Sequence, residues 1–215
     1  MLQANDLGFQ YEFLPARSPD NDVTLLVLHG TGGTQYDLIP LGERLYPAAA
    51  ILSPLGKVSE NGMARFFRRL SPGVFDLDDL RFRTNELADF VRRAVATHQL
   101  NSHRVVAAGY SNGANIAASL LLLAPDVLRC AVLLRPMVPL VPQKLPNLDG
   151  VQVFISGGRH DEIVAPAEAV RLAELLHESG ATVSIHWAEA GHGLISQEIA
   201  AARDWLAAHI KCSAS

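Results

Sequence analysis

Short, almost wholly apolar segments alternate with longer amphipathic segments along most of this chain of 215 residues. Four of the short segments are rich in Val, Leu and Ile: 25–28, 105–108, 131–134 and 151–155. Continuous apolarity is typical of strands that are buried on both faces, as in a parallel sheet covered by helices. Weaker strand candidates are 49–52 and 182–187, and 9–14 is a candidate edge strand.

Three of the longer segments have apolar residues at helical spacing: 87–95, 169–176 and 199–206. The second of them begins near Pro166 and stops at Gly180, which are the end positions that these residue types prefer. Alternating strands and helices predict an α/β fold, a doubly wound, mostly parallel sheet with helices on both faces. No repeat, low-complexity tract or linker interrupts the pattern, so residues 1–215 are predicted to form a single domain.

Two segments break this alternation. Residues 53–79 are polar and punctuated by Gly and Pro, and residues 135–149 contain four prolines. Each begins where a predicted strand ends, and open α/β sheets bind their ligands at the carboxyl ends of the strands. We therefore expect 53–79 and 135–149 to form long loops over an active site.

The segment Gly109–Gly113 reads G-x-S-x-G and lies between the apolar strand and a predicted helix over 114–123. Strand, glycine-flanked serine and helix in that order predict a nucleophile elbow, a strained turn that lifts a serine above the sheet. Ser111 is therefore the candidate nucleophile. An ordinary glycine-rich turn is the alternative.

A serine hydroxyl needs a neighbouring base, and His192 is the best placed histidine, in a glycine-flanked loop after the last predicted strand. In such folds the acid precedes the histidine along the chain, and 157–162 follows a predicted strand. Either Asp161 or Glu162 could fulfil that role. The neighbouring His160 raises the question of a metal, but no second ligand stands at a suitable spacing, so neither a metal nor a cofactor is expected.

Ester hydrolysis also needs donors for the oxyanion. We expect the backbone N–H groups of Asn112, which follows the nucleophile, and Thr31, in the loop after the first buried strand, with Gly32 as the alternative to Thr31. Residues 30–35 also approximate a dinucleotide fingerprint, but Gln35 replaces its third glycine. A nucleotide-binding protein is thus a remote second interpretation.

Four ordered motifs in this chain, LHGTGG, GYSNGANIA, GGRHDEIV and AGHG, resemble those of the phospholipase/carboxylesterase family of α/β-hydrolases, which is related to dienelactone hydrolase. The similarity extends from about Val23 to Leu206. It is greatest to small bacterial carboxylesterases that are associated with the metabolism of aromatic compounds such as hydroquinone or catechol.

The resemblance implies an α/β-hydrolase fold in which Ser111 is the nucleophile, Asp161 the acid and His192 the base, with Thr31 and Asn112 as oxyanion donors. A dienelactone hydrolase proper has cysteine at the nucleophile position, so its substrates are not implied. The family often has Pro directly after Val164, whereas this chain has Ala165 there.

Substrate-binding residues are expected on the two long segments. Met63, Phe66, Phe67 and Met137 could line an apolar pocket, or they could pin the segments to the core. Arg65, Arg68 and Arg69 could orient a carboxylate-bearing substrate, or they could form a solvated basic face. A small-molecule ester with a short chain or an aryl group is the expected substrate. A thioesterase, acyltransferase or lysophospholipase would use the same triad, and a non-catalytic binder is a further alternative.

Composition and charge narrow the partners. The net charge of −4 offers no basic field for nucleic acid, so no nucleic-acid partner is expected. The longest apolar stretch, 116–124, is too short to span a membrane, and the first ten residues do not resemble a secretion signal. A cytoplasmic enzyme is therefore expected, with a homodimer as the default assembly.

Overall fold

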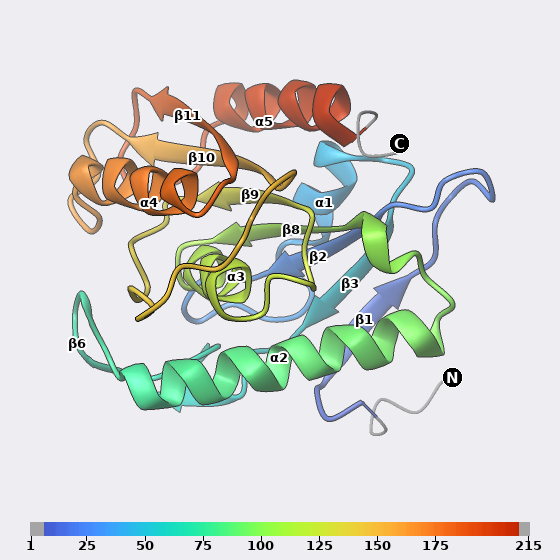
Figure 1. The fold of residues 1–215 in the computed structure, drawn as a ribbon, viewed down its shortest axis with the longest axis horizontal. Coiled ribbons are helices and arrows are strands. Elements are labelled where there is room, and N and C mark those ends of the chain that lie inside the picture. Colours follow the sequence, from blue (N-terminus) through green and yellow to red (C-terminus); the bar gives the residue numbers. More distant parts are fainter. Residues whose placement is uncertain (1–6, 211–215) are drawn as a thin grey trace.

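The computed structural model describes residues 7–210, and its centre is a seven-stranded sheet in the order β1-β3-β2-β8-β9-β10-β11 (Figure 1). β1 pairs antiparallel with β3, and every other neighbouring pair in the sheet is parallel. The strands are β1 (Tyr11–Leu14), β2 (Thr24–Leu28), β3 (Ala50–Pro54), β8 (Val105–Tyr110), β9 (Cys130–Leu134), β10 (Gln152–Gly158) and β11 (Thr182–Ala188). The predicted mostly parallel sheet is confirmed, and β1 is the edge strand that was expected within residues 9–14.

Helices cover both faces of the sheet (Figure 1). They are α1 (Ile39–Leu45), α2 (Leu77–Thr97), α3 (Asn112–Leu123), α4 (Pro166–Glu178) and α5 (Ser196–His209), with a 3₁₀ turn, η1 (Ser102–Arg104), before β8. Buried residues of α2, α3 and α4 form one core with one face of the sheet, and those of α1 and α5 form a second core on the other face. This is the doubly wound arrangement that the alternation predicts.

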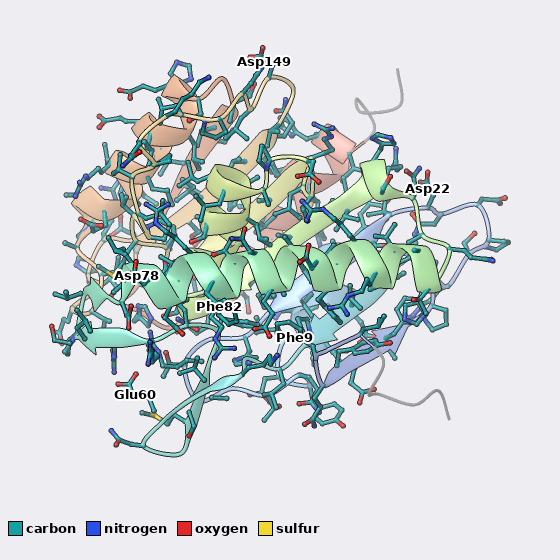
Figure 2. The ribbon with its side chains drawn as sticks, turned by 60° about the horizontal axis from the view of Figure 1, so that its bottom comes forward. Phe9, Asp22, Glu60, Asp78, Phe82 and Asp149 are labelled. Atoms are coloured by element: carbon teal, nitrogen blue, oxygen red, sulfur yellow. The ribbon has the colours of Figure 1, made fainter. Side chains whose placement is uncertain are left out.

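Helix α2 has the amphipathic character that the spacing of residues 87–95 predicts. Its inner face, including Leu87 and Phe90, is fully buried. Its outer face carries exposed Asp78 and Phe82, which Figure 2 shows on the open side of the helix. The short helix α1 was not expected, because seven residues with Pro and Gly give too short a periodic pattern.

The segment 53–79 differs from the expected loop. It contains the end of β3, two short hairpins and the beginning of α2. The hairpins pair β4 (Val58–Glu60) with β5 (Met63–Arg65) and β6 (Arg69–Ser71) with β7 (Val74–Phe75). Strands of two or three residues are too short for an alternating pattern to be recognised in the sequence. The other segment, 135–149, has no helix or strand, as expected.

The parallel strands determine where chemistry can occur. Because β2, β8, β9, β10 and β11 all run in one direction, the residues that follow them meet at one edge of the sheet. The predicted triad and oxyanion residues follow four of these strands: β2, β8, β10 and β11. No helix within residues 7–210 is long and apolar enough to cross a membrane.

Candidate active site

Ser111 lies at a sharp turn between β8 and α3. Its backbone is in the left-handed region, with φ 53° and ψ −113°, which is strained for a residue with a side chain. The turn packs directly against β2, since a Cβ atom on Gly113 would lie 1.9 Å from the carbonyl oxygen of Leu28. The Ser111 N–H donates to the carbonyl of Leu134 at 2.8 Å, which ties the turn to β9. The sequence therefore builds the predicted elbow.

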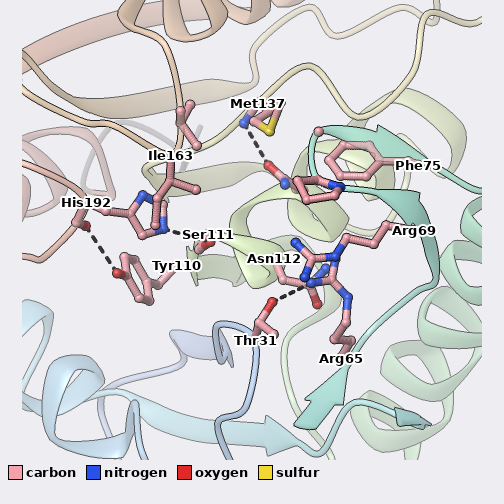
Figure 3. Close-up of a pocket in the computed structure, with 14 residues that line it drawn as sticks. Thr31, Arg65, Arg69, Phe75, Tyr110, Ser111, Asn112, Met137, Ile163 and His192 are labelled. Carbon is pink, nitrogen blue, oxygen red and sulfur yellow. Dashed lines mark hydrogen bonds between the residues drawn. The ribbon is translucent and has the colours of Figure 1, made fainter. Parts of the chain in front are cut away.

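The three side chains predicted to form a triad lie within hydrogen-bonding distance of one another. His192 Nε2 is 3.0 Å from Ser111 Oγ, and His192 Nδ1 is 2.8 Å from Asp161 Oδ2. Figure 3 shows the imidazole of His192 next to Ser111 at the wall of a cavity. An acid, an imidazole and a hydroxyl in this order can pass a proton from the hydroxyl to the imidazole.

Asp161 is held as a carboxylate. Burial raises its pKa, but hydrogen bonds from the Val164 N–H, from His192 and from the Ile163 N–H outweigh burial and hold the pKa below its ordinary value. The two N–H groups bind Oδ1 at 2.9 and 2.8 Å, which leaves Oδ2 to His192. The neighbouring acid, Glu162, is exposed to solvent. The geometry therefore selects Asp161 from the two carboxylates.

The loop that carries His192 is fastened on both sides of the imidazole. Arg135 Nε donates to the carbonyl of Gly191 at 2.9 Å, and its Nη2 donates to the carbonyl of Gly193 at 3.1 Å. The Tyr110 hydroxyl donates to the carbonyl of His192 itself at 3.1 Å. These three bonds leave the backbone of the loop little freedom to move the ring away from the nucleophile.

Arg135 is in turn fixed by a buried ion pair. Its Nη1 and Nη2 donate to the two carboxylate oxygens of Glu198 at 2.6 and 2.9 Å, and both side chains are fully buried. Glu198 also accepts from the Ser156 hydroxyl at 2.5 Å and from the Ile195 N–H at 2.7 Å. A bidentate pair with its remaining acceptors satisfied is the arrangement that makes buried charge tolerable.

The predicted oxyanion donors face the cavity from two elements. Asn112 begins α3 directly after Ser111, and Thr31 lies in the loop after β2; both residues line the cavity. The N–H of Gly32, the alternative donor, is already bound to the carbonyl of Ala64 at 2.8 Å. No hydrogen bond from the Thr31 N–H is found within residues 7–210. The occupied Gly32 donor favours Thr31.

The residues on either side of the hairpin β4–β5 bind the loop after β2 and the beginning of α3. Gly56 N–H donates to His29 Nε2 at 2.9 Å, and Phe66 N–H donates to the side-chain oxygen of Asn112 at 2.8 Å. Burial lowers the pKa of His29, against a raising effect of its bond to the Gly30 carbonyl. A neutral His29 can accept the hydrogen bond from the Gly56 N–H and so join the two segments.

A cavity of about 380 Å³ opens above Ser111. Its lining, shown in Figure 3, is Thr31, Arg65, Arg69, Pro72, Gly73, Phe75, Tyr110, Ser111, Asn112, Asn115, Met137, Ile163, Val164 and His192. The volume lies in the range of small-molecule sites. Its mixture of apolar side chains and a few converging donors is also typical of such sites.

Of the four apolar residues predicted to line the pocket, only Met137 does so. Phe66 and Phe67 are instead buried in the core beside α2, where Phe67 packs edge-on against Phe75 at 5.0 Å. Met63 is 40% exposed near the turn of its hairpin. The prediction was wrong for these three, because the hairpins turn the aromatic pair inward and leave Phe75 at the cavity.

The three arginines of segment 53–79 differ in whether they reach the cavity. Arg65 and Arg69 line the cavity, whereas Arg68 does not. The side chain of Arg68 is 62% exposed and forms ion pairs with Asp76 and Asp79. Sequence reasoning missed Tyr110, Phe75, Ile163 and Val164 as cavity residues and missed Arg135 altogether. The only signal for Arg135 was a charged residue directly after a wholly apolar strand.

Nothing within residues 7–210 gathers three or more His, Cys, Asp or Glu side chains in a way that could hold a metal ion. His160, which raised the question of a metal in the sequence, is exposed and lies 3.3 Å from Glu189.

Known proteins resemble this chain over most of its length. A family model described as Phospholipase/Carboxylesterase matches residues 73–210. The putative hydrolase MhqD of Bacillus subtilis (strain 168) is 50% identical over 185 residues, which cover 86% of this chain and 92% of that protein. Among solved structures, the Bacillus cereus carboxylesterase is 44% identical with a TM-score of 0.92, covering 96% of this chain and 97% of that one. YahD, solved with malic acid, is 32% identical with a TM-score of 0.88, covering 94% and 99%.

Proposed function

Because this chain belongs to the phospholipase/carboxylesterase family and has its α/β-hydrolase fold, we propose that it cleaves short-chain or aryl carboxylic esters with Ser111, His192 and Asp161 as the catalytic triad. That the chain is a carboxylic ester hydrolase follows from the family and its relatives. The observation that carries the assignment of residues is a pair of hydrogen bonds: His192 Nδ1–H donates to Asp161, and His192 Nε2 accepts from the Ser111 hydroxyl.

In the first half of the reaction, His192 Nε2 takes the proton of the Ser111 hydroxyl while Oγ bonds to the carbonyl carbon of the ester. The carbonyl oxygen becomes an oxyanion, stabilised by the N–H groups of Thr31 and Asn112. The bond from carbon to the alcohol oxygen then breaks, and that oxygen takes the proton from His192. An alcohol leaves, and the acyl group remains on Ser111.

In the second half, water replaces the alcohol. His192 takes a proton from water as its oxygen bonds to the acyl carbon, and the same oxyanion donors are used again. Ser111 Oγ leaves with the proton from His192, and the carboxylic acid is released. Asp161 remains ionised throughout and stabilises the imidazolium that forms twice in each cycle. Its depressed pKa supports that role down to mildly acidic pH.

Matched variants test these assignments with 4-nitrophenyl acetate and butyrate as substrates. We expect Ser111→Ala and His192→Ala to lower kcat by about 10⁴-fold or more, and Asp161→Asn by about 10⁴-fold, because the triad works as a unit. Glu162→Gln and His160→Ala, which change exposed neighbours of Asp161, serve as controls with unchanged kcat.

Covalent labelling gives an independent readout. A fluorophosphonate should modify the wild type at Ser111 and leave Ser111→Ala unlabelled. Full activity of Ser111→Ala, or an effect of Glu162→Gln equal to that of Asp161→Asn, would overturn the proposed triad. Faster turnover of thioesters than of oxygen esters would make the thioesterase alternative the better description.

Location and assembly remain proposals from the sequence: a cytoplasmic enzyme, with a homodimer as the default, acting on a small molecule and not on nucleic acid. The remote nucleotide-binding interpretation loses support, because the glycine-rich loop is not followed directly by a helix; α1 begins only at Ile39.

A further inference from the structure

The cavity above Ser111 is cationic. Two of its lining residues, Arg65 and Arg69, carry positive charge, and no Asp or Glu is among the described residues that line it. Asp161 lies behind His192 and is engaged with it. A neutral ester would leave this charge without a function in binding.

Glu60 neutralises only one of the two guanidinium groups. It lies 3.2 Å from Arg65 Nε and 2.8 Å from Arg69 Nη2, outside the cavity. The hydrogen bond from Arg69 lowers the pKa of Glu60, against the raising effect of burial and with further help from the charges of Arg65 and Arg69. With Glu60 ionised, the cluster retains one net positive charge, which is the charge that a single carboxylate would balance.

Both guanidinium groups also have unused donors. Arg65 is only 3% exposed; its Nη1 donates to the Thr31 hydroxyl at 2.6 Å and its Nε to the Phe67 carbonyl at 3.2 Å. The bonds of Arg69 run from Nε and Nη2 to Glu60. Within residues 7–210, no hydrogen bond from Arg65 Nη2 or Arg69 Nη1 is found. Guanidinium nitrogens bind carboxylates in preference to most other groups.

The position of the arginines indicates which part of the ester carries the anion. Figure 3 shows Arg65 and Arg69 on the side of Ser111 away from His192, and Arg65 donates to the hydroxyl of Thr31. His192 has to protonate the departing alcohol oxygen, so the alcohol lies on the His192 side. The acyl chain then extends toward the arginines.

We propose that this enzyme prefers esters whose acyl part ends in a carboxylate, that is, half-esters of short dicarboxylic acids, with Arg65 and Arg69 as the carboxylate site. The proposal rests on the proposed serine esterase function. Hydrolysis of such a half-ester consumes one water and releases the dicarboxylate, the alcohol and one proton. The cavity is large enough for a short chain of this kind.

The test compares two esters of equal chain length, monomethyl glutarate and methyl valerate, by titration of released acid at neutral pH. Methyl esters are chosen because the carboxylate of an aryl half-ester would expel its own leaving group without enzyme. We expect kcat/KM for monomethyl glutarate to exceed that for methyl valerate about tenfold or more, which is the usual effect of one hydrogen-bonded charge pair.

Variants of neighbouring arginines identify the site. Arg69→Gln should lower the ratio of the two kcat/KM values about tenfold, and Arg69→Lys, which retains the charge without the planar fork, should lower it less. Arg68→Gln, one residue away but exposed and outside the cavity, should leave the ratio unchanged.

The outcomes separate this proposal from the proposed function. Equal kcat/KM values for the two esters, or an equal effect of Arg68→Gln and Arg69→Gln, would overturn the carboxylate site while the esterase function stands. If 4-nitrophenyl acetate is not hydrolysed and Ser111 is not labelled, the esterase function itself is wrong. A preference for 4-acetoxybutanoate over butyl acetate, without one for the half-ester, would contradict the acyl-side placement.

Discussion

Two arginine–glutamate clusters lie on opposite sides of the nucleophile, and they differ in burial and in charge balance. Behind His192, Arg135 pairs with Glu198, both side chains being fully buried, and Arg135 Nε also lies 3.9 Å from Asp161 Oδ2. Across the cavity, Arg65 and Arg69 share the single carboxylate of Glu60, whose side chain is 28% exposed, as is about the same fraction of Arg69. The pair Arg135–Glu198 is closed to solvent and neutral. The second cluster is open to solvent at Glu60 and Arg69, but not at Arg65, and retains a positive charge.

The difference in surroundings gives the same residue types different roles. The donors of Arg135 are used within the protein, on Glu198, Ser156 and the two carbonyls that flank His192. It cannot bind a substrate, but it can determine where the imidazole lies. Arg65, which is itself buried, and Arg69, which is partly exposed, both line the cavity and retain unused donors, so they can bind a substrate. Unused donors and unbalanced charge, more than burial, therefore separate recognition from positioning.

The largest expected effect is on the free energy of unfolding, when the glutamate of each cluster is replaced by glutamine. Glu198→Gln leaves the Arg135 guanidinium buried without its counter-charge and should lower the free energy of unfolding by about 3 to 5 kcal/mol. Glu60→Gln acts on a solvent-accessible ion pair and should change it by less than about 1 kcal/mol. Unfolding curves in guanidinium chloride would give both values, provided that the dependence of the free energy on denaturant concentration is the same in all variants.

Equal losses in the two variants would remove the distinction between a closed and an open cluster. The double variant Arg135→Met with Glu198→Met provides a further check, because removing both charges should recover much of the stability that either single change loses. A double variant as unstable as the sum of the single ones would mean that packing, and not charge pairing, dominates the cluster.

The second prediction concerns the positioning role of Arg135. Arg135→Lys retains the positive charge but cannot hold Glu198 and both loop carbonyls at once, so the His192 ring should lose its fixed orientation. We expect kcat for 4-nitrophenyl butyrate to fall about tenfold or more with little change in KM. Arg92→Lys, in an exposed pair with Asp126, is the matched control. A rise in KM with kcat retained would place Arg135 in substrate binding instead.

The sequence was sufficient to predict that Ser111 and His192 lie together, because each stands in a local pattern: a glycine-flanked serine between strand and helix, and a glycine-flanked histidine after the last strand. The choice of Asp161 over Glu162 required the family resemblance, since neighbouring carboxylates differ only in direction. In the structure that direction follows from the turn in which Ile163 and Val164 donate to Asp161.

The two arginine clusters were beyond the sequence for different reasons. Arg135 and Glu198 are 63 residues apart, and no local period links them. Arg65, Arg68 and Arg69 were recognised as a basic group, but which of them face the cavity depends on the register of hairpins only two or three residues long. The same short hairpins explain why Phe66 and Phe67 were wrongly assigned to the pocket.

A smaller effect should come from salt, which is expected to weaken substrate binding by the open cluster more than it affects the closed cluster. Added NaCl screens charges that solvent can reach, so raising ionic strength from 0.01 to about 0.5 M should lower the preference for monomethyl glutarate over methyl valerate severalfold. The kcat for methyl valerate, which depends on the closed cluster, should change little. A preference that is independent of salt would indicate that Arg65 and Arg69 are shielded from solvent when substrate is bound.

The smallest effect should be that of Glu60→Gln on the KM for the half-ester. Removing this carboxylate raises the net charge of the open cluster from one to two, and Arg69 loses the partner that now occupies its Nε and Nη2. We expect KM for monomethyl glutarate to fall about two- to fivefold, because an added unit charge near the protein surface contributes on the order of 1 kcal/mol. KM for methyl valerate is the internal control. A rise in KM for the half-ester would mean that Glu60 holds Arg69 in place for binding, so that the open cluster, like the closed one, depends on its acid for geometry.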